Sequence, residues 1–110
     1  MRLAIFASLA LAASASTFRF SNIHGDDMVL KSAPYQAQVW GFTSFADDTV
    51  TVTFKGHEIA AIVSVYKGNI TWHATLPATR ASISTTYNIS AHSVGIKSTV
   101  TLERVLFGDV

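Results

Sequence analysis

The stretch TVTVTFKG, residues 49–56, decides the fold, because valine or phenylalanine alternates with threonine along it. Successive side chains of a β-strand point to opposite faces, so Val50, Val52 and Phe54 are expected to face a core while the threonines face solvent. Lys55-Gly56, which follows, predicts a tight hairpin turn. The stretch therefore indicates a half-buried strand of an antiparallel sheet.

The same period of two continues on both sides of this stretch, and no segment shows a convincing helical period. Trp72 falls on the apolar face of its segment, which predicts a place in the core, whereas Trp40 shares its face with glutamines. We expect an all-β fold, an immunoglobulin-like antiparallel β-sandwich of about 7–8 short strands with Trp40 or Trp72 near its centre; a compact barrel is the alternative. The expected strands are Phe18–Ile23, Met28–Leu30, Gln36–Phe42, Thr49–Phe54, Glu58–Val65, Ile70–Leu76, Thr86–His92 and Ile96–Phe107, the last open to a break near Glu103.

The first fifteen residues are expected to form a signal peptide. Arg2 provides a positive charge, residues 3–12 form a short apolar run, and Ala13-Ser14-Ala15 fits a small-x-small cleavage site. A membrane anchor is the alternative, but the apolar run is about half of the roughly 20 residues that a spanning helix needs. We therefore expect cleavage between Ala15 and Ser16, no membrane span, and a single β-sandwich module over residues 16–110.

The charge of the module bears on its partners, and its cysteine content bears on the source of its stability. Of the eight Lys and Arg residues, Arg2 lies in the expected signal peptide, and the others balance the seven Asp and Glu residues. The module is then formally neutral and has no basic cluster, so nucleic acid is not expected as a partner. The absence of cysteine indicates that stability comes from the module's own core or from a neighbouring domain, and not from disulfides.

Two sequons, Asn69-Ile70-Thr71 and Asn88-Ile89-Ser90, match the acceptor pattern for N-glycosylation. Both agree with a secretory route. The alternation along residues 86–92 places Asn88 on the outward face of its strand, where a glycan is tolerated.

The local signatures of a serine hydrolase are missing from the sequence. It has no Gly-x-Ser-x-Gly, and Gly25-Asp26-Asp27 and Gly108-Asp109-Val110 both lack serine in the third place. Each Gly-Asp is therefore interpreted as a turn, and no catalytic residue is expected in this chain.

The sequence lacks the residue spacings of a metal site. The histidines form no i, i+2 or i, i+4 pair of the kind that begins a zinc site, and the Asp-Asp pairs lack the spacing of a calcium loop. We expect neither metal nor cofactor, and place these residues at surfaces, turns and solvated loops. Aromatic side chains could stack on sugar rings if the fold exposes them as a platform. The residues considered are His24, His57, His73 and His92; Asp26-Asp27 and Asp47-Asp48; and Trp40, Phe42, Trp72 and Tyr87.

Five segments, taken in order and with their spacing, resemble the amino-terminal region of sialate O-acetylesterases. The resemblance covers residues 18 to 110, although Lys31 stands where that family usually has glutamine and Ala81–Ser84 replaces a stretch richer in Gly and Pro. The segments are Asp26–Lys31, Val39–Gly41, Val50–Phe54, Trp72 with Leu76-Pro77, and Val105–Val110.

The resemblance implies a function that this chain alone would not perform. In that family the Gly-Asp-Val ending is followed by a Trp-Leu-Cys-Ser-Gly-Gln-Ser-Asn-like stretch with the nucleophilic serine of an SGNH-type hydrolase domain, so the catalytic groups would lie beyond Val110. The expectation is a non-catalytic N-terminal fragment of a carbohydrate esterase, extracellular or lysosomal, that removes O-acetyl groups from sialic acids. The missing hydrolase domain would be its partner. The alternative is a stand-alone secreted module that binds a glycan or a protein.

Overall fold

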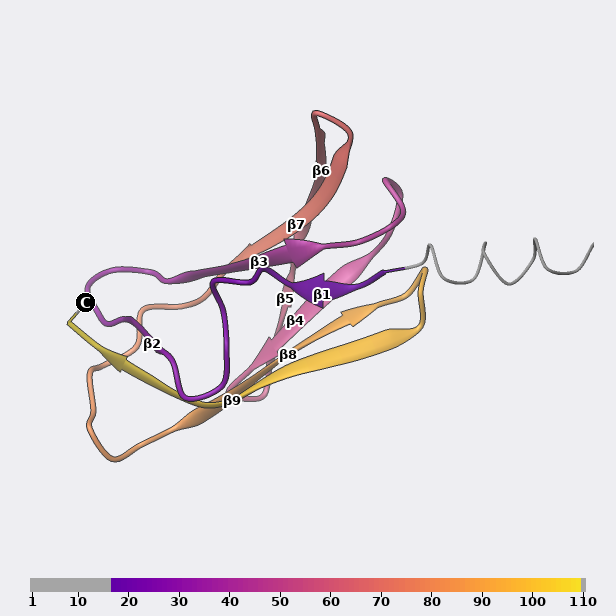
Figure 1. The fold of residues 1–110 in the computed structure, drawn as a ribbon. Helices are drawn as coiled ribbons and strands as arrows, with labels where there is room; N and C mark the ends of the chain where they lie inside the picture. Colours follow the sequence, from indigo (N-terminus) through magenta and orange to yellow (C-terminus); the bar gives the residue numbers. More distant parts are fainter. Residues whose placement is uncertain (1–16, 110) are drawn as a thin grey trace, which may run out of the picture.

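The computed structural model describes residues 17–109 and shows a β-sandwich (Figure 1). The expected signal peptide over residues 1–15, with its cleavage point between Ala15 and Ser16, lies outside the described residues. Within residues 17–109 every regular element is a strand. The strands are β1 (Arg19–Phe20), β2 (Val29–Lys31), β3 (Gln38–Phe42), β4 (Val50–Phe54), β5 (His57–Ala60), β6 (Ile62–Tyr66), β7 (Asn69–Thr75), β8 (Tyr87–Ser93) and β9 (Ser98–Gly108).

The strand order confirms the immunoglobulin-like sandwich. One sheet has the order β1-β3-β7-β6 and the other the order β2-β9-β8-β4-β5. In chain order these correspond to strands A, B, E and D of an immunoglobulin domain opposite strands G, F and C, with β2 added beside G and β5 beside C. Neighbouring strands are antiparallel except β2 and β9, which run parallel with Val29 opposite Leu106.

The core lies between the sheets, and alternation along the strands fills it as the sequence predicts. Val50, Val52 and Phe54 of β4 are at most 2% exposed, and Ile89 and Ala91 of β8 face them from the same sheet. Trp72 of β7 is fully buried, which confirms its predicted place in the core. Burying side chains of this size contributes about 1.5–3 kcal/mol each, so this inner layer is the main source of the domain's stability.

A glycine on β3 makes room for the Trp72 indole. Gly41 pairs with Trp72 across the β3–β7 ladder and with Phe20 across the β1–β3 ladder. A Cβ added at Gly41 would lie 2.0 Å from the Arg19 carbonyl oxygen and 2.8 Å from the indole carbon Cζ2. Because these neighbours include backbone, only glycine allows the strands and the indole to approach so closely.

The predicted hairpin turn at Lys55-Gly56 is present, and a second turn of the same kind follows β6. Lys55 and Gly56 join β4 to β5, and Lys67 and Gly68 join β6 to β7, all four with positive φ between 51° and 83°. Positive φ at both central residues is the type I′ turn, whose twist matches that of the flanking strands.

The segment expected as one strand over Glu58–Val65 is two strands in different sheets, and that prediction was wrong. β5 pairs with β4, whereas β6 pairs with β7 in the opposite sheet. The chain crosses at Ala61, whose N–H donates to the carbonyl of Val50. Exposure keeps alternating through the crossing and no Gly or Pro marks it, so the local pattern carries no sign of the change of sheet.

The break considered near Glu103 is a bulge within a continuous strand. β9 runs unbroken from Ser98 to Gly108, but its register with β8 shifts between Tyr87 and Ile89. Arg104 has a φ of 56°, the left-handed conformation expected at a bulge. The bulge changes which side chains β9 presents to solvent, and those side chains belong to a polar cluster described below.

Candidate functional site

Among residues 17–109 the structure holds two open hollows and two carboxylate clusters. The first hollow lies beside the outer face of the β1-β3-β7-β6 sheet. Trp40 and Phe42 are two residues apart on β3 and share this face, with their ring centroids 5.3 Å apart. The Arg19 guanidinium lies 4.4 Å from the Phe42 ring centroid, a cation–π contact. Trp40 and Phe42 are thus half-buried outer-face aromatics, and Trp40 does not join Trp72 in the core.

This first hollow is a groove of about 490 Å³, which we call the Asn69 groove. Its walls are Thr17 and Arg19 at the start of the described chain, the end of β3 with the following loop over residues 42–44, and the β6–β7 turn over residues 68–70. The Thr43 N–H donates to the Ile70 carbonyl and fixes the turn against the loop. Most of its lining surface is polar.

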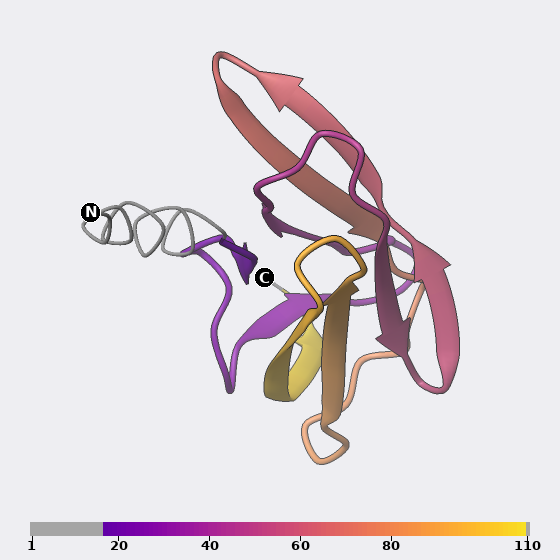
Figure 2. The same cartoon turned by 90° about the vertical axis from the view of Figure 1, so that its right-hand side faces the viewer.

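The second hollow is an apolar groove of about 380 Å³ near the last described residue. Val29 of β2 and Leu106, Phe107 and Gly108 of β9 line one side, and residues 81–83 of the loop between β7 and β8 line the other. This loop projects from the lower edge of the sandwich in both views (Figures 1 and 2). Ile83 is 98% exposed, which is unusual for a large apolar side chain. We call this hollow the Ile83 groove.

The first carboxylate cluster, the Asp48 network, joins two loops at one end of the sandwich. Asp48 Oδ2 accepts hydrogen bonds from the hydroxyls of Thr43 and Ser93, both at 2.5 Å, and Oδ1 accepts from the Gly95 N–H at 2.8 Å. Ser93 is fully buried and Thr43 is 6% exposed. Partial burial raises the pKa of Asp48, but these hydrogen bonds outweigh it and hold the pKa below its usual value.

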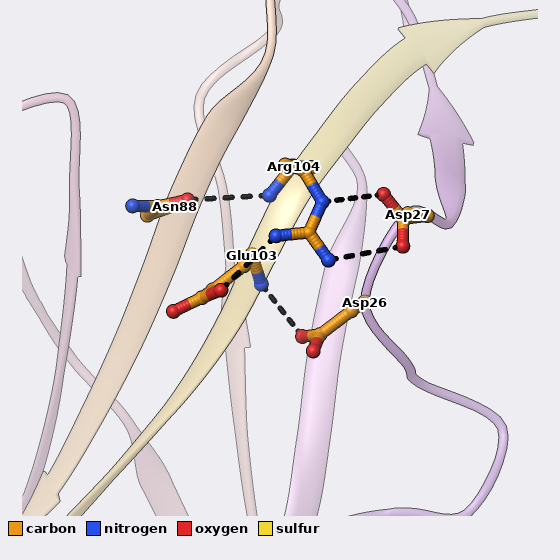
Figure 3. Close-up of polar contacts among 5 residues, drawn as sticks. All are labelled: Asp26, Asp27, Asn88, Glu103 and Arg104. Carbon is orange, nitrogen blue, oxygen red and sulfur yellow. Dashed lines mark hydrogen bonds and ion pairs between the residues drawn. The ribbon is translucent and has the colours of Figure 1, made fainter.

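The second cluster, the Asp27–Arg104 clasp, ties the loop before β2 to the bulge of β9 (Figure 3). The Arg104 guanidinium donates to both oxygens of Asp27, at 2.7 and 3.2 Å, and to Glu103. Asp26 accepts the Glu103 N–H and Asn88 Oδ1 accepts the Arg104 N–H, at 2.8 and 3.2 Å. The hydrogen bond and charge of Arg104 lower the pKa of Asp27, and Asp27 in turn raises the pKa of Arg104.

Both Asp-Asp pairs, predicted to lie in solvated loops, therefore contribute a carboxylate that is bonded to protein donors. Asp47 is exposed and Asp48 is not, while Asp26 and Asp27 are both exposed. In residues 17–109 no three His, Cys, Asp or Glu side chains come together as metal ligands.

The histidines lie on separate elements. His24, in the loop after β1, accepts the backbone N–H of Trp40 through Nε2 at 3.2 Å, and burial lowers its pKa. His57 of β5 is exposed and His73 lies on the outer face of β7. His92 Nδ1 lies 2.8 Å from Thr99 Oγ1 in a cross-strand pair on the exposed face, and neither residue lines either groove.

Both sequon asparagines are exposed, and they have different surroundings. Asn69 begins β7 and lines the Asn69 groove. Asn88 lies on β8 beside the bulge, outward as predicted, and its amide nitrogen points away from Arg104 (Figure 3). Whether either carries a glycan stays a prediction.

The site residues that sequence reasoning missed are those whose role depends on distant partners. Thr43 and Ser93, which are 5 and 45 residues from Asp48 in the sequence, both donate hydrogen bonds to its carboxylate. Arg19 contacts the Phe42 ring from the neighbouring strand. Ile83 had a local signal, since it is a lone large apolar residue in a Ser- and Thr-rich loop.

Comparison with known proteins adds no family: neither a protein-family model nor a curated protein matches the chain. In the described part of the chain, no helix has the length and apolar character to cross a membrane.

Proposed function

We propose that this chain is the non-catalytic N-terminal β-sandwich module of a sialate O-acetylesterase-like carbohydrate esterase, whose full-length form hydrolyses O-acetyl esters of sialic acids in the lysosome or outside the cell. The module's task is to pack against and support the hydrolase domain. It brings no nucleophile of its own to the reaction.

The observation that carries this proposal is the Ile83 groove. Its lining is mainly apolar and includes Gly108 and Asp109, the residues that end the segment resembling the esterases. A domain joined after Val110 would begin beside this groove, where Ile83 and Val29 expose 98% and 40% of their surface. Apolar surface gathered at one place on a small domain is typical of a surface that another domain covers.

The segments that resemble the esterases also have structural reasons to occur together. Val39 and Gly41 of one segment pair with Ala74 and Trp72 of another in the β3–β7 ladder. The segment Val105–Val110 contributes the buried Val105 and Phe107. The resemblance thus falls largely on residues that build one core.

The experiment is to read the coding sequence past codon 110 and to assay the purified chain on an O-acetylated sialic acid. We expect the reading frame to continue into Trp-Leu-Cys-Ser-Gly-Gln-Ser, and the 110-residue chain to show no ester hydrolysis above buffer. Turnover by the chain alone would contradict the non-catalytic role.

A stop codon directly after Val110 would favour the second candidate, a stand-alone secreted module that binds a protein partner. The observation in its favour is edge strand β6, on which Ile62, Val65 and Tyr66 are each at least 60% exposed. Natural edge strands usually block further pairing with charges or proline, and β6 has neither. Such an edge can add a partner's strand.

A further inference from the structure

The Asn69 groove has a feature that the esterase proposal does not use: one of its walls is a glycosylation acceptor. Asn69 is exposed and belongs to the sequon completed by Thr71. Residues two apart on a strand share a face, so Asn69 and Thr71 both lie on the outer face of the sheet. Thr71 pairs directly with Phe42, which places Asn69 diagonally beside the Phe42 ring and Arg19.

We propose that Asn69 carries an N-linked glycan and that its first sugar, an N-acetylglucosamine, packs into the Asn69 groove. The groove, at about 490 Å³, is within the range of small-ligand sites, and it opens next to the amide that would bear the sugar. A covalent link holds the sugar at high effective concentration, so weak contacts suffice to keep it in place. The proposal rests on the secretory route expected from residues 1–15, and is independent of the esterase assignment.

The covalent step needs a donor of defined class, a polyprenyl-diphosphate-linked oligosaccharide supplied by the secretory compartment. The Asn69 amide nitrogen forms a bond to the anomeric carbon of the first sugar. The bond from that carbon to the phosphate oxygen breaks, the polyprenyl diphosphate leaves with the electron pair, and one amide proton is released. No redox change occurs.

The walls of the groove match the chemistry of an N-acetylated sugar. Arg19 uses only Nη1 for its hydrogen bonds to Phe20 and Asn22 within residues 17–109, so Nε and Nη2 keep N–H donors for the acetamido carbonyl. Phe42 provides an apolar surface for the sugar's C–H groups. Thr17 adds a hydroxyl to the lining.

Asn88 provides the contrast within the same chain. It is exposed like Asn69, but it lines neither of the two grooves, and its Oδ1 already accepts the Arg104 N–H. A glycan at Asn88 would therefore start outside both grooves.

The test expresses the full chain in a eukaryotic secretory host, behind that host's own leader so that entry does not depend on residues 1–15. Site occupancy is read by mass spectrometry after enzymatic removal of the glycan, which converts the glycosylated asparagine to aspartate. Release by an endoglycosidase that cuts between the first two sugars is then timed on the native protein at each occupied sequon.

We expect occupancy of Asn69 and a rate of release about tenfold slower than after unfolding, since hydrogen bonds from a charged donor hold the sugar in place. Arg19→Met, which keeps the aliphatic stem but removes the donors, should restore fast release without changing occupancy. Ser90→Ala removes the second sequon while leaving Asn88 and its hydrogen bond intact, and should not change the rate at Asn69.

Two outcomes would overturn the proposal. An unmodified Asn69 in secreted chain shows that the site is not used. An occupied Asn69 whose glycan is released equally fast from native and unfolded protein shows that the sugar does not enter the groove. Neither outcome bears on the esterase proposal, which is decided by the coding sequence and the hydrolysis assay.

Discussion

The two Asp-Asp pairs of this sandwich look alike in the sequence and are used differently in the structure. Asp48 receives hydrogen bonds from three neutral donors, and two of these, the hydroxyls of Thr43 and Ser93, belong to residues that are at most 6% exposed. Asp27 meets Arg104 in the open, where their side chains keep 63% and 55% of their exposure. A carboxylate that satisfies buried donors stabilises a fold more than an ion pair in water, because buried donors have no alternative partner.

The largest expected effect is that of Asp48→Ala. The change leaves the hydroxyls of Thr43 and Ser93 and the N–H of Gly95 without their acceptor, and should lower the free energy of unfolding by about 2 kcal/mol. Urea denaturation measures it. Asp47→Ala, next in the chain and exposed, is the matched control and should stay within about 0.5 kcal/mol of the wild type. Equal losses for the two variants would show that the hydrogen bonds to Asp48 are not the source of the stabilisation.

The pH dependence of Asp48 should follow from its lowered pKa. Its folded pKa lies below the unfolded value of about 3.9, so its stabilisation is complete above that value and is lost as the pH falls through the folded pKa. The stability difference between wild type and Asp48→Ala should therefore be constant from about pH 5 upward and shrink toward about pH 2. Thermal unfolding of both proteins across this range measures it, and a difference that grows in acid would show that the carboxylate is not stabilising in its charged form.

The smallest effect is expected for the Asp27–Arg104 clasp. Arg104→Met keeps the aliphatic stem and the backbone bond to Asn88 but removes the guanidinium, so only the exposed ion pairs are lost. The resulting decrease in melting temperature should be smaller than for Asp48→Ala and should disappear in about 1 M salt, where charges are screened within roughly 3 Å. Calorimetry of both proteins at low and high salt measures this decrease. A loss that persists in salt would assign the clasp a packing role.

The strands could be predicted from sequence wherever one side of the alternation is buried. On β4 and β7 the residue types alone identify the inner face, because the apolar residues of the alternation are the buried ones. These residues are Val50, Val52 and Phe54 on β4, and Trp72 and Ala74 on β7. The crossing at Ala61 could not be predicted, because the alternation continues through it while the hydrogen-bonding partner changes from β4 to β7.

The candidate sites depend on contacts between residues distant in sequence, and for that reason little of them could be predicted. The sequons were visible as motifs, but the groove beside Asn69 exists only because β1, β3 and the β6–β7 turn meet. Likewise, Val29 and Leu106 line the Ile83 groove side by side because β2 pairs in parallel with β9. No local sequence pattern predicts that pairing.

That parallel pair has a consequence for a force applied to the two ends of the module. The two ends of the described chain lie at opposite ends of the sandwich (Figure 1), and β2 and β9 run in the same direction along it. Pulling the ends apart draws the two strands past each other, so the hydrogen bonds between them are loaded in shear and must break together. If a second domain follows, a pulling force carried through the module would load the pairing of β2 with β9 in shear.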